Sequence, residues 1–237
     1  MEGANYASAS FTKIVKEKAT IADLIQYMNY GKMKRTDEND IQDGEFSASD
    51  IAISGTFAYQ LSERIVGGIT AKMALSYIGD YSSMAMGVDL GINYYDPDRE
   101  WSLSAVVKNL GGEIKAYDEE YNKMPIDLQI GASKTFAALP VRVSATLVDM
   151  THYDYSFRNH ICLGADILFS ESIWAGAGYN FRRNDEMKIQ DFEDESSHGA
   201  GLTLGAGVNL DRFKINVAYG KFHVSASSII INAAFSL

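Results

Sequence analysis

The sequence predicts an all-β fold, an antiparallel transmembrane β-barrel, on the strength of three observations. Eleven stretches alternate apolar residues with small or polar ones, as strands do when successive side chains point to opposite faces. The connections between them alternate between short ones and longer or more polar ones, as on the two sides of a membrane barrel. Mean hydropathy is slightly negative and no run of about 18 apolar residues occurs, which excludes a membrane-spanning helix.

The segment 84–94 illustrates the alternation. Met86, Leu90 and Ile92 share one parity, whereas Asp89 and Asn93 share the other, so one face is apolar and the other is polar. The first two strands are weaker, because 16–28 has mixed periodicity and also fits the start of a short helix. The predicted strands are 4–14, 20–33, 46–60, 65–77, 83–96, 100–110, 126–136, 139–150, 158–169, 173–183, 199–210, 212–221 and 227–237.

The connections between these strands form two sets that alternate along the chain. The short set is 16–18, 62–63, 96–98, 137–138, 170–172 and the turn at Asp211. The longer set is 34–45, 79–82, 111–125, 151–157, 184–198 and 222–226. Outer-membrane barrels have short periplasmic turns and long outer loops, so the longer set is expected to be extracellular.

One barrel domain is expected over residues 1–237, with about 13 strands visible. Closed single-chain bacterial barrels have even strand counts, so a fourteenth strand is expected to come before residue 1. Residues 1–20 carry no apolar core of a signal peptide, which we also expect to precede this sequence.

The net charge of −10 argues against nucleic acid as a partner. Much of the acid lies in two predicted outer loops, which are either solvated surface or contacts for a cation or protein partner. The candidate partner-facing residues are Asp37, Glu38, Asp40, Asp43, Asp185, Glu186, Asp191, Glu193, Asp194 and Glu195.

Charged residues also occupy the polar parity of the strands, where they are expected to face the lumen: Lys72, Asp89, Lys108, Asp127, Arg142 and Asp166. Such residues either line a channel or pair across neighbouring strands and fill the lumen. Both signs occur in nearly equal number and an unpaired buried charge is costly, which favours pairing.

The sequence holds no pattern of an enzyme. No serine sits in a nucleophile elbow, and Gly176-Ala-Gly178 is too short for a dinucleotide fingerprint. The four histidines have no metal-ligand spacing, and Cys162 is the single cysteine. We therefore expect no catalytic residues, cofactor or metal.

Several segments resemble the PorV/PorQ family of Bacteroidota outer-membrane barrels, and PorQ in particular. They are 27–38, 44–48, 106–112, 124–134, 139–144 and 178–183, and the resemblance runs from about residue 20 to the end. It implies a fourteen-stranded, FadL-like barrel in the outer membrane of a Gram-negative bacterium, surrounded by membrane lipid. It also implies an anchoring role in a surface attachment complex of the type IX secretion system, with PorZ-like, PorU-like sortase and PorV-like partners.

The residues leave two alternatives open. The fold relatives suggest a FadL-like outer-membrane transporter of hydrophobic small molecules, for which small residues on the inner faces would leave a cavity. A soluble β-sandwich or lipocalin-like carrier is the other, but too many strands present an apolar face with nothing left to cover it.

Overall fold

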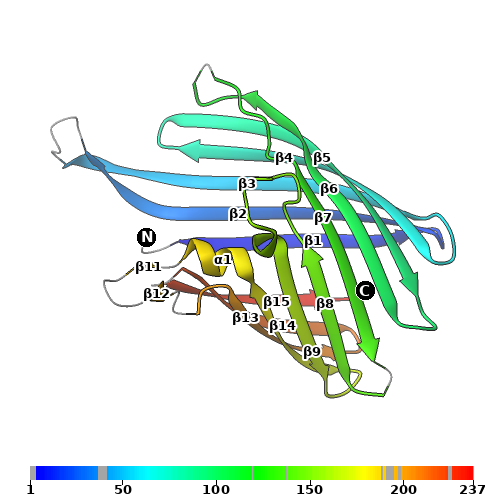
Figure 1. Cartoon of the computed structure of the whole chain (residues 1–237). Coiled ribbons are helices and arrows are strands. Elements are labelled where there is room, and N and C mark those ends of the chain that lie inside the picture. Colours follow the sequence, from blue (N-terminus) through cyan, green and yellow to red (C-terminus); the bar gives the residue numbers. More distant parts are fainter. Residues whose placement is uncertain are drawn as a thin grey trace. The chain divides into compact units, whose positions relative to one another are not determined.

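Thirteen strands follow one another in chain order in a single antiparallel sheet (Figure 1). The structure is a computed structural model that describes residues 4–36, 42–118, 120–136, 138–187, 189–190, 195–196, 199–223 and 226–236. The strands are β1 Asn5–Val15, β2 Ala19–Thr36, β3 Gln42–Gln60, β4 Ile65–Ile78, β5 Tyr81–Asp96, β6 Trp101–Lys115, β7 Asp127–Phe136, β8 Val141–Leu147, β9 Ile161–Leu168, β10 Ile173–Asn180, β13 Leu202–Leu210, β14 Phe213–His223 and β15 Ala226–Phe235.

Each predicted strand overlaps an observed one, including the two weaker ones at the start of the chain. The alternative of a short helix near Thr20 is wrong, because β2 is a strand from residue 19 onward. Asp23 of β2 pairs with Phe11 of β1 on one side and with Gly55 of β3 on the other. Backbone pairing on both edges therefore overrides the weak local helix signal.

The chain divides into two compact units: residues 1–92 with 106–126, and residues 93–105 with 127–237. The first holds β1 to β4, most of β5, the later part of β6 and the segment that follows it. The second holds the end of β5, the start of β6, and everything from β7 to β15.

The sheet has the opposite polarity to that of a water-soluble protein. Exposure alternates along β9 and β13, and the exposed parity is the apolar one, with Leu163, Ile167, Leu204 and Val208 all more than a third exposed. Among the described residues, the only buried apolar residues are Ala48 and Ala200. A large exposed apolar face is the arrangement of a barrel surrounded by lipid.

The connections differ from the predicted sets. Within the described residues, 116–126, 148–160 and 181–201 are long, but three other members of the longer set are short. β2 continues to residue 36 and β3 begins at residue 42, so most of the predicted loop 34–45 is strand. Gly79 and Asp80 alone join β4 to β5, with Gly79 at a φ of 56°. β14 and β15 likewise extend into the predicted loop 222–226. Strand pairing thus extends beyond the alternation of apolar residues.

The predicted strand 173–183 ends early, because a helix replaces its last three residues. α1 spans Phe181–Glu186, and the side chain of Asn180 caps it by accepting a hydrogen bond from the Arg183 N–H at 3.0 Å. A 3-10 turn, η1 (Phe157–His160), precedes β9, and the short strands β11 (Ile189–Gln190) and β12 (Glu195–Ser196) form a separate pair.

In the part of the chain that the structure describes, no helix has the length and apolar character needed to cross a bilayer.

Candidate partner-binding site

The β2–β3 hairpin runs on past the strands on either side of it (Figure 1). The pairing of β1 with β2 reaches Asn29, and the pairing of β3 with β4 reaches Ala48. Beyond these points residues 32–36 and 42–47 pair with each other, and we call this two-stranded extension the ribbon. β2 and β3 have 18 and 19 residues, whereas a strand needs only about 9–11 residues to cross a bilayer.

A β-bulge marks the base of the ribbon. Tyr30 and Gly31 of β2 together oppose Ala48 of β3, because the register shifts between Asn29 and Lys32. Gly31 has a φ of 79°, which favours glycine, and its N–H donates to the Asn29 Oδ1 at 2.7 Å. Because bulges bend and twist a strand, the ribbon changes direction where it begins.

A hollow of about 740 Å³ lies at the base of the ribbon, against the β4–β5 turn. The Gly79 N–H donates to the Ser47 carbonyl at 3.0 Å and joins the turn to the ribbon. Tyr81 is 66% exposed. The hollow is lined by Lys32, Arg35, Glu45, Phe46, Ser47, Ile78, Gly79, Asp80 and Tyr81. Charges of both signs beside exposed aromatic surface are typical of a protein contact.

The Lys32 Nζ and the Glu45 Oε2 lie 3.2 Å apart across the ribbon, with side chains 79% and 55% exposed. An ion pair this exposed contributes little to folding stability. Both side chains therefore remain available to a partner at small cost to the ribbon.

The acidic residues predicted as partner contacts fall in different places. Asp37, Glu38, Asp40, Asp191, Glu193 and Asp194 lie outside the described residues. Asp43 belongs to β3 in the ribbon and Glu195 to β12, where it pairs with Gln190, but the structure describes only their backbones. Asp185 and Glu186 lie in α1.

The side chains of Asp185 and Glu186 are engaged within the protein. The Asn159 Nδ2 donates to the Asp185 Oδ2 at 3.2 Å, which links α1 to η1. The Arg182 Nε donates to the Glu186 Oε1 at 2.6 Å, one turn along the same helix. The second acidic loop is therefore partly a structural support, a role that its composition did not indicate.

Arg182 is the central residue of this support. Its Nη1 lies 2.5 Å from the Asp149 Oδ2, and its Nη2 donates to the Tyr155 hydroxyl at 2.8 Å. Its guanidinium also lies 4.0 Å from the Tyr155 ring centroid. Burial alone would lower the pKa of Arg182, but hydrogen bonds to Glu186 and Asp149 outweigh it and hold the pKa above its ordinary value.

Asp149 connects this support to the polar face of the sheet. Its backbone is left-handed, with a φ of 57°, and its N–H donates to the Asp127 Oδ1 at 2.7 Å. Gln129 donates to the other oxygen of Asp127, and His152 contacts Asp149. Asp127, predicted as a lumen-facing charge, therefore orients the start of the connection 148–160.

The remaining charges of the polar parity are mostly paired. The Lys72 Nζ lies 2.6 Å from the Asp89 Oδ1, and the Arg142 Nη2 lies 2.8 Å from the Asp166 Oδ2 on the neighbouring strand. Lys108 has no ion pair among the described residues. These distances describe the polar face of the sheet. That the paired charges fill a lumen stays a prediction.

Comparison with known proteins identifies the family of this chain. The model of the family described as "Type IX secretion system membrane protein PorP/SprF" matches residues 55–228. The chain belongs to the PorP/SprF family. The expectation of a type IX secretion system membrane protein is confirmed, while the closer resemblance to PorV/PorQ stays a prediction. No protein with curated annotation matches the sequence.

Two solved structures share the fold of this PorP/SprF-family protein. The crystal structure of the Pseudomonas putida toluene transporter TodX is 12% identical, with a TM-score of 0.55 over 90% of this chain and 76% of that one. The crystal structure of a Pseudomonas aeruginosa FadL homologue is 9% identical, with a TM-score of 0.51 over 96% of this chain and 74% of that one. The predicted all-β, FadL-like fold is confirmed.

Proposed function

We propose that this PorP/SprF-family protein resides in the outer membrane and anchors a surface attachment complex through the ribbon. The ribbon carries the proposal, because β2 and β3 are far longer than a bilayer-spanning strand and project a charged and aromatic hollow beyond the sheet. By the resemblance to PorV/PorQ, its partners are PorZ-like, PorU-like or PorV-like proteins of the same secretion system.

The ribbon is suited to a partner of mixed charge. Lys32 and Arg35 line the hollow together with Glu45 and Asp80, so no single sign dominates. Tyr81 supplies exposed aromatic area of the kind that carries binding energy in protein interfaces. The charged residues then determine orientation and association rate more than affinity.

The test is affinity purification of the tagged, full-length protein from detergent-solubilised outer membranes, with mass spectrometry of the proteins recovered. The wild type is expected to recover a sortase-like protein and a large surface partner. The double variant Phe46→Ser/Tyr81→Ser is expected to lower partner recovery at least ~10-fold, a loss of about 1.4 kcal/mol or more at a hot spot.

The matched control is Leu139→Ser, which alters an apolar residue, 60% exposed, in the short connection between β7 and β8. It is expected to recover the partners at the wild-type level. Partner recovery unchanged in the Phe46→Ser/Tyr81→Ser variant would contradict the role of the ribbon. Recovery of the wild-type protein without partners, but carrying a hydrophobic small molecule, would instead favour a transporter, as TodX is for toluene.

A further inference from the structure

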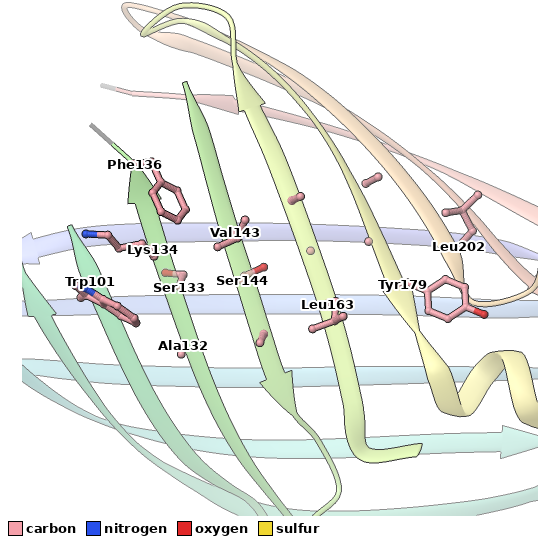
Figure 2. Close-up of a pocket in the computed structure, with 15 residues that line it drawn as sticks. Trp101, Ala132, Ser133, Lys134, Phe136, Val143, Ser144, Leu163, Tyr179 and Leu202 are labelled. Carbon is pink, nitrogen blue, oxygen red and sulfur yellow. The ribbon is translucent and has the colours of Figure 1, made fainter. Parts of the chain in front are cut away.

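A second hollow, of about 680 Å³, lies on the exposed apolar parity of the second unit and is unrelated to the ribbon. It crosses from β6 and β7 over β8 and β9 to β10 and β13. Figure 2 shows Trp101, Lys134 and Phe136 toward one end and Tyr179 and Leu202 toward the other. Its volume falls within the range of about 300–1,000 Å³ that is usual for ligand pockets.

The hollow exists because small side chains meet across neighbouring strands. Ala132 of β7 pairs with Ala145 of β8, and Ala165 of β9 pairs with Ala177 of β10. Elsewhere on this face the same parity carries larger residues, such as Ile167 and Leu204. Because these alanines are smaller than the apolar residues around them, they leave an apolar depression in the surface.

One charged residue stands on this apolar face. Lys134 is the only charged residue on the apolar parity of β7, β8, β9, β10 and β13. Its Nζ lies 5.5 Å from the Trp101 ring centroid and donates to the Arg99 carbonyl oxygen. No carboxylate pairs with it in the described parts of the chain. Within the described residues, the Lys134 ammonium therefore has no carboxylate counterion.

The position of Lys134 matches the level of lipid headgroups. It lies two residues before the end of β7, beside the short connection to β8, and Trp101 is the first residue of β6. Tryptophan concentrates at membrane interfaces, and lysine extends its ammonium toward headgroups while its stem stays in the apolar layer. A positive charge at one end of an apolar hollow complements a molecule with an acyl chain and an anionic phosphate.

We propose that this hollow binds an anionic phospholipid, with an acyl chain over the paired alanines and the phosphate at the Lys134 ammonium. The site belongs to the lipid-facing side of the sheet and takes its ligand from the bilayer itself. It does not rest on the anchoring role of the ribbon, and either can fail without the other.

Tryptophan fluorescence supplies the test, because Trp101 and Trp174, the two tryptophans of the chain, lie in different places. Trp101 lines the hollow, whereas Trp174 packs against Gly205 and Gly207 on the other parity. The full-length protein in a non-ionic detergent is titrated with brominated phosphatidylglycerol or brominated phosphatidylcholine, since bromine quenches tryptophan on contact. Brominated phosphatidylglycerol is expected to quench at a lower concentration than brominated phosphatidylcholine. The Trp101→Phe variant is expected to lose this quenching.

Variants separate the charge from the hollow. Lys134→Gln is expected to raise the half-quenching concentration of phosphatidylglycerol roughly tenfold, whereas Lys134→Arg retains the preference. Ala165→Phe fills the hollow and is expected to weaken the binding of both lipids. Its control, Ala206→Phe, adds the same ring on the exposed apolar parity of β13 outside the hollow and is expected to change neither.

Heat-dependent mobility on an SDS gel checks that each variant is folded before it is titrated. Equal quenching of the wild type by the two lipids would overturn the proposal, since it would indicate unspecific contact with detergent-dispersed lipid. A preference that survives Lys134→Gln, or an Ala165→Phe variant that binds as the wild type does, would also overturn it.

Discussion

Lys72 and Asp89 show how single residues stabilise the polar face of the sheet. Their side chains are 20% and 16% exposed, and the Lys72 ammonium also donates to the Asn109 side chain. The Asp89 Oδ1 accepts the Asn109 N–H at 2.8 Å, which holds Asn109 in a left-handed conformation with a φ of 64°. One carboxylate thus serves as counterion and as backbone acceptor.

Removing the charge of Asp89 alone is therefore expected to lower the free energy of unfolding more than removing the charges of both Asp89 and Lys72. Asp89→Asn keeps an acceptor for Asn109 but leaves Lys72 without its counterion, and the free energy of unfolding is expected to fall by about 1–3 kcal/mol. The double variant Lys72→Met/Asp89→Asn leaves neither charge of the pair behind, and its free energy of unfolding is expected to fall less than that of Asp89→Asn. Urea unfolding followed by gel mobility measures both, and a double variant less stable than Asp89→Asn would contradict this account.

The helix α1 shows how an element can depend on a residue far away in the chain. It has six residues, too few for an isolated helix to be stable in water, so its stability comes from contacts with the rest of the protein. The contact between Arg182 and Asp149 is one of these, and it joins α1 to the connection 148–160. The acidic end of α1 and this connection are therefore expected to loosen together.

Arg182→Gln is expected to speed amide hydrogen exchange in residues 149–160 and 181–187 by roughly tenfold, as the loss of a charge-assisted contact of about 1.5 kcal/mol predicts. Arg212→Gln, in the exposed turn between β13 and β14, is the control and is expected to leave both segments protected. Exchange that stays unchanged in the Arg182→Gln variant would show that α1 is held by other contacts.

The strands were predictable because their signal is local: alternation between an apolar and a polar parity is visible within each segment. The ribbon was not, because residues 34–45 carry charged or polar residues on both parities. Only the pairing of 34–36 with 42–45 shows these two segments to be strand. The alternation of Tyr179 and Phe181 suggested a longer β10, whereas the Asn180 cap begins a helix.

The candidate site was predictable only in part. Periodicity placed Asp127 and its companions on the polar parity, but not the bond from Asp127 to the backbone of Asp149. The contact of Arg182 with Asp149 spans 33 residues and leaves no pattern in the sequence. Composition therefore suggested free acidic loops where the structure has Glu186 bound to Arg182.

At the scale of the whole molecule, strand length separates two tasks. β8 and β9 have seven and eight residues, somewhat fewer than the about 9–11 usual for crossing a bilayer, whereas β3 has 19. The exposed apolar parity suits contact with lipid, and the ribbon carries polar and aromatic residues beyond it. This division supports the proposal that this type IX secretion system membrane protein holds its partners through the ribbon.

Site-specific photo-crosslinking in living cells tests this claim most directly. A photoreactive amino acid replaces Tyr81 at the base of the ribbon or, as control, the exposed Glu171 in the short connection between β9 and β10. We predict that position 81 is crosslinked to a surface-exposed protein of the secretion system and that position 171 is not. Absence of a crosslink from position 81, or capture of the same protein from position 171, would contradict the account.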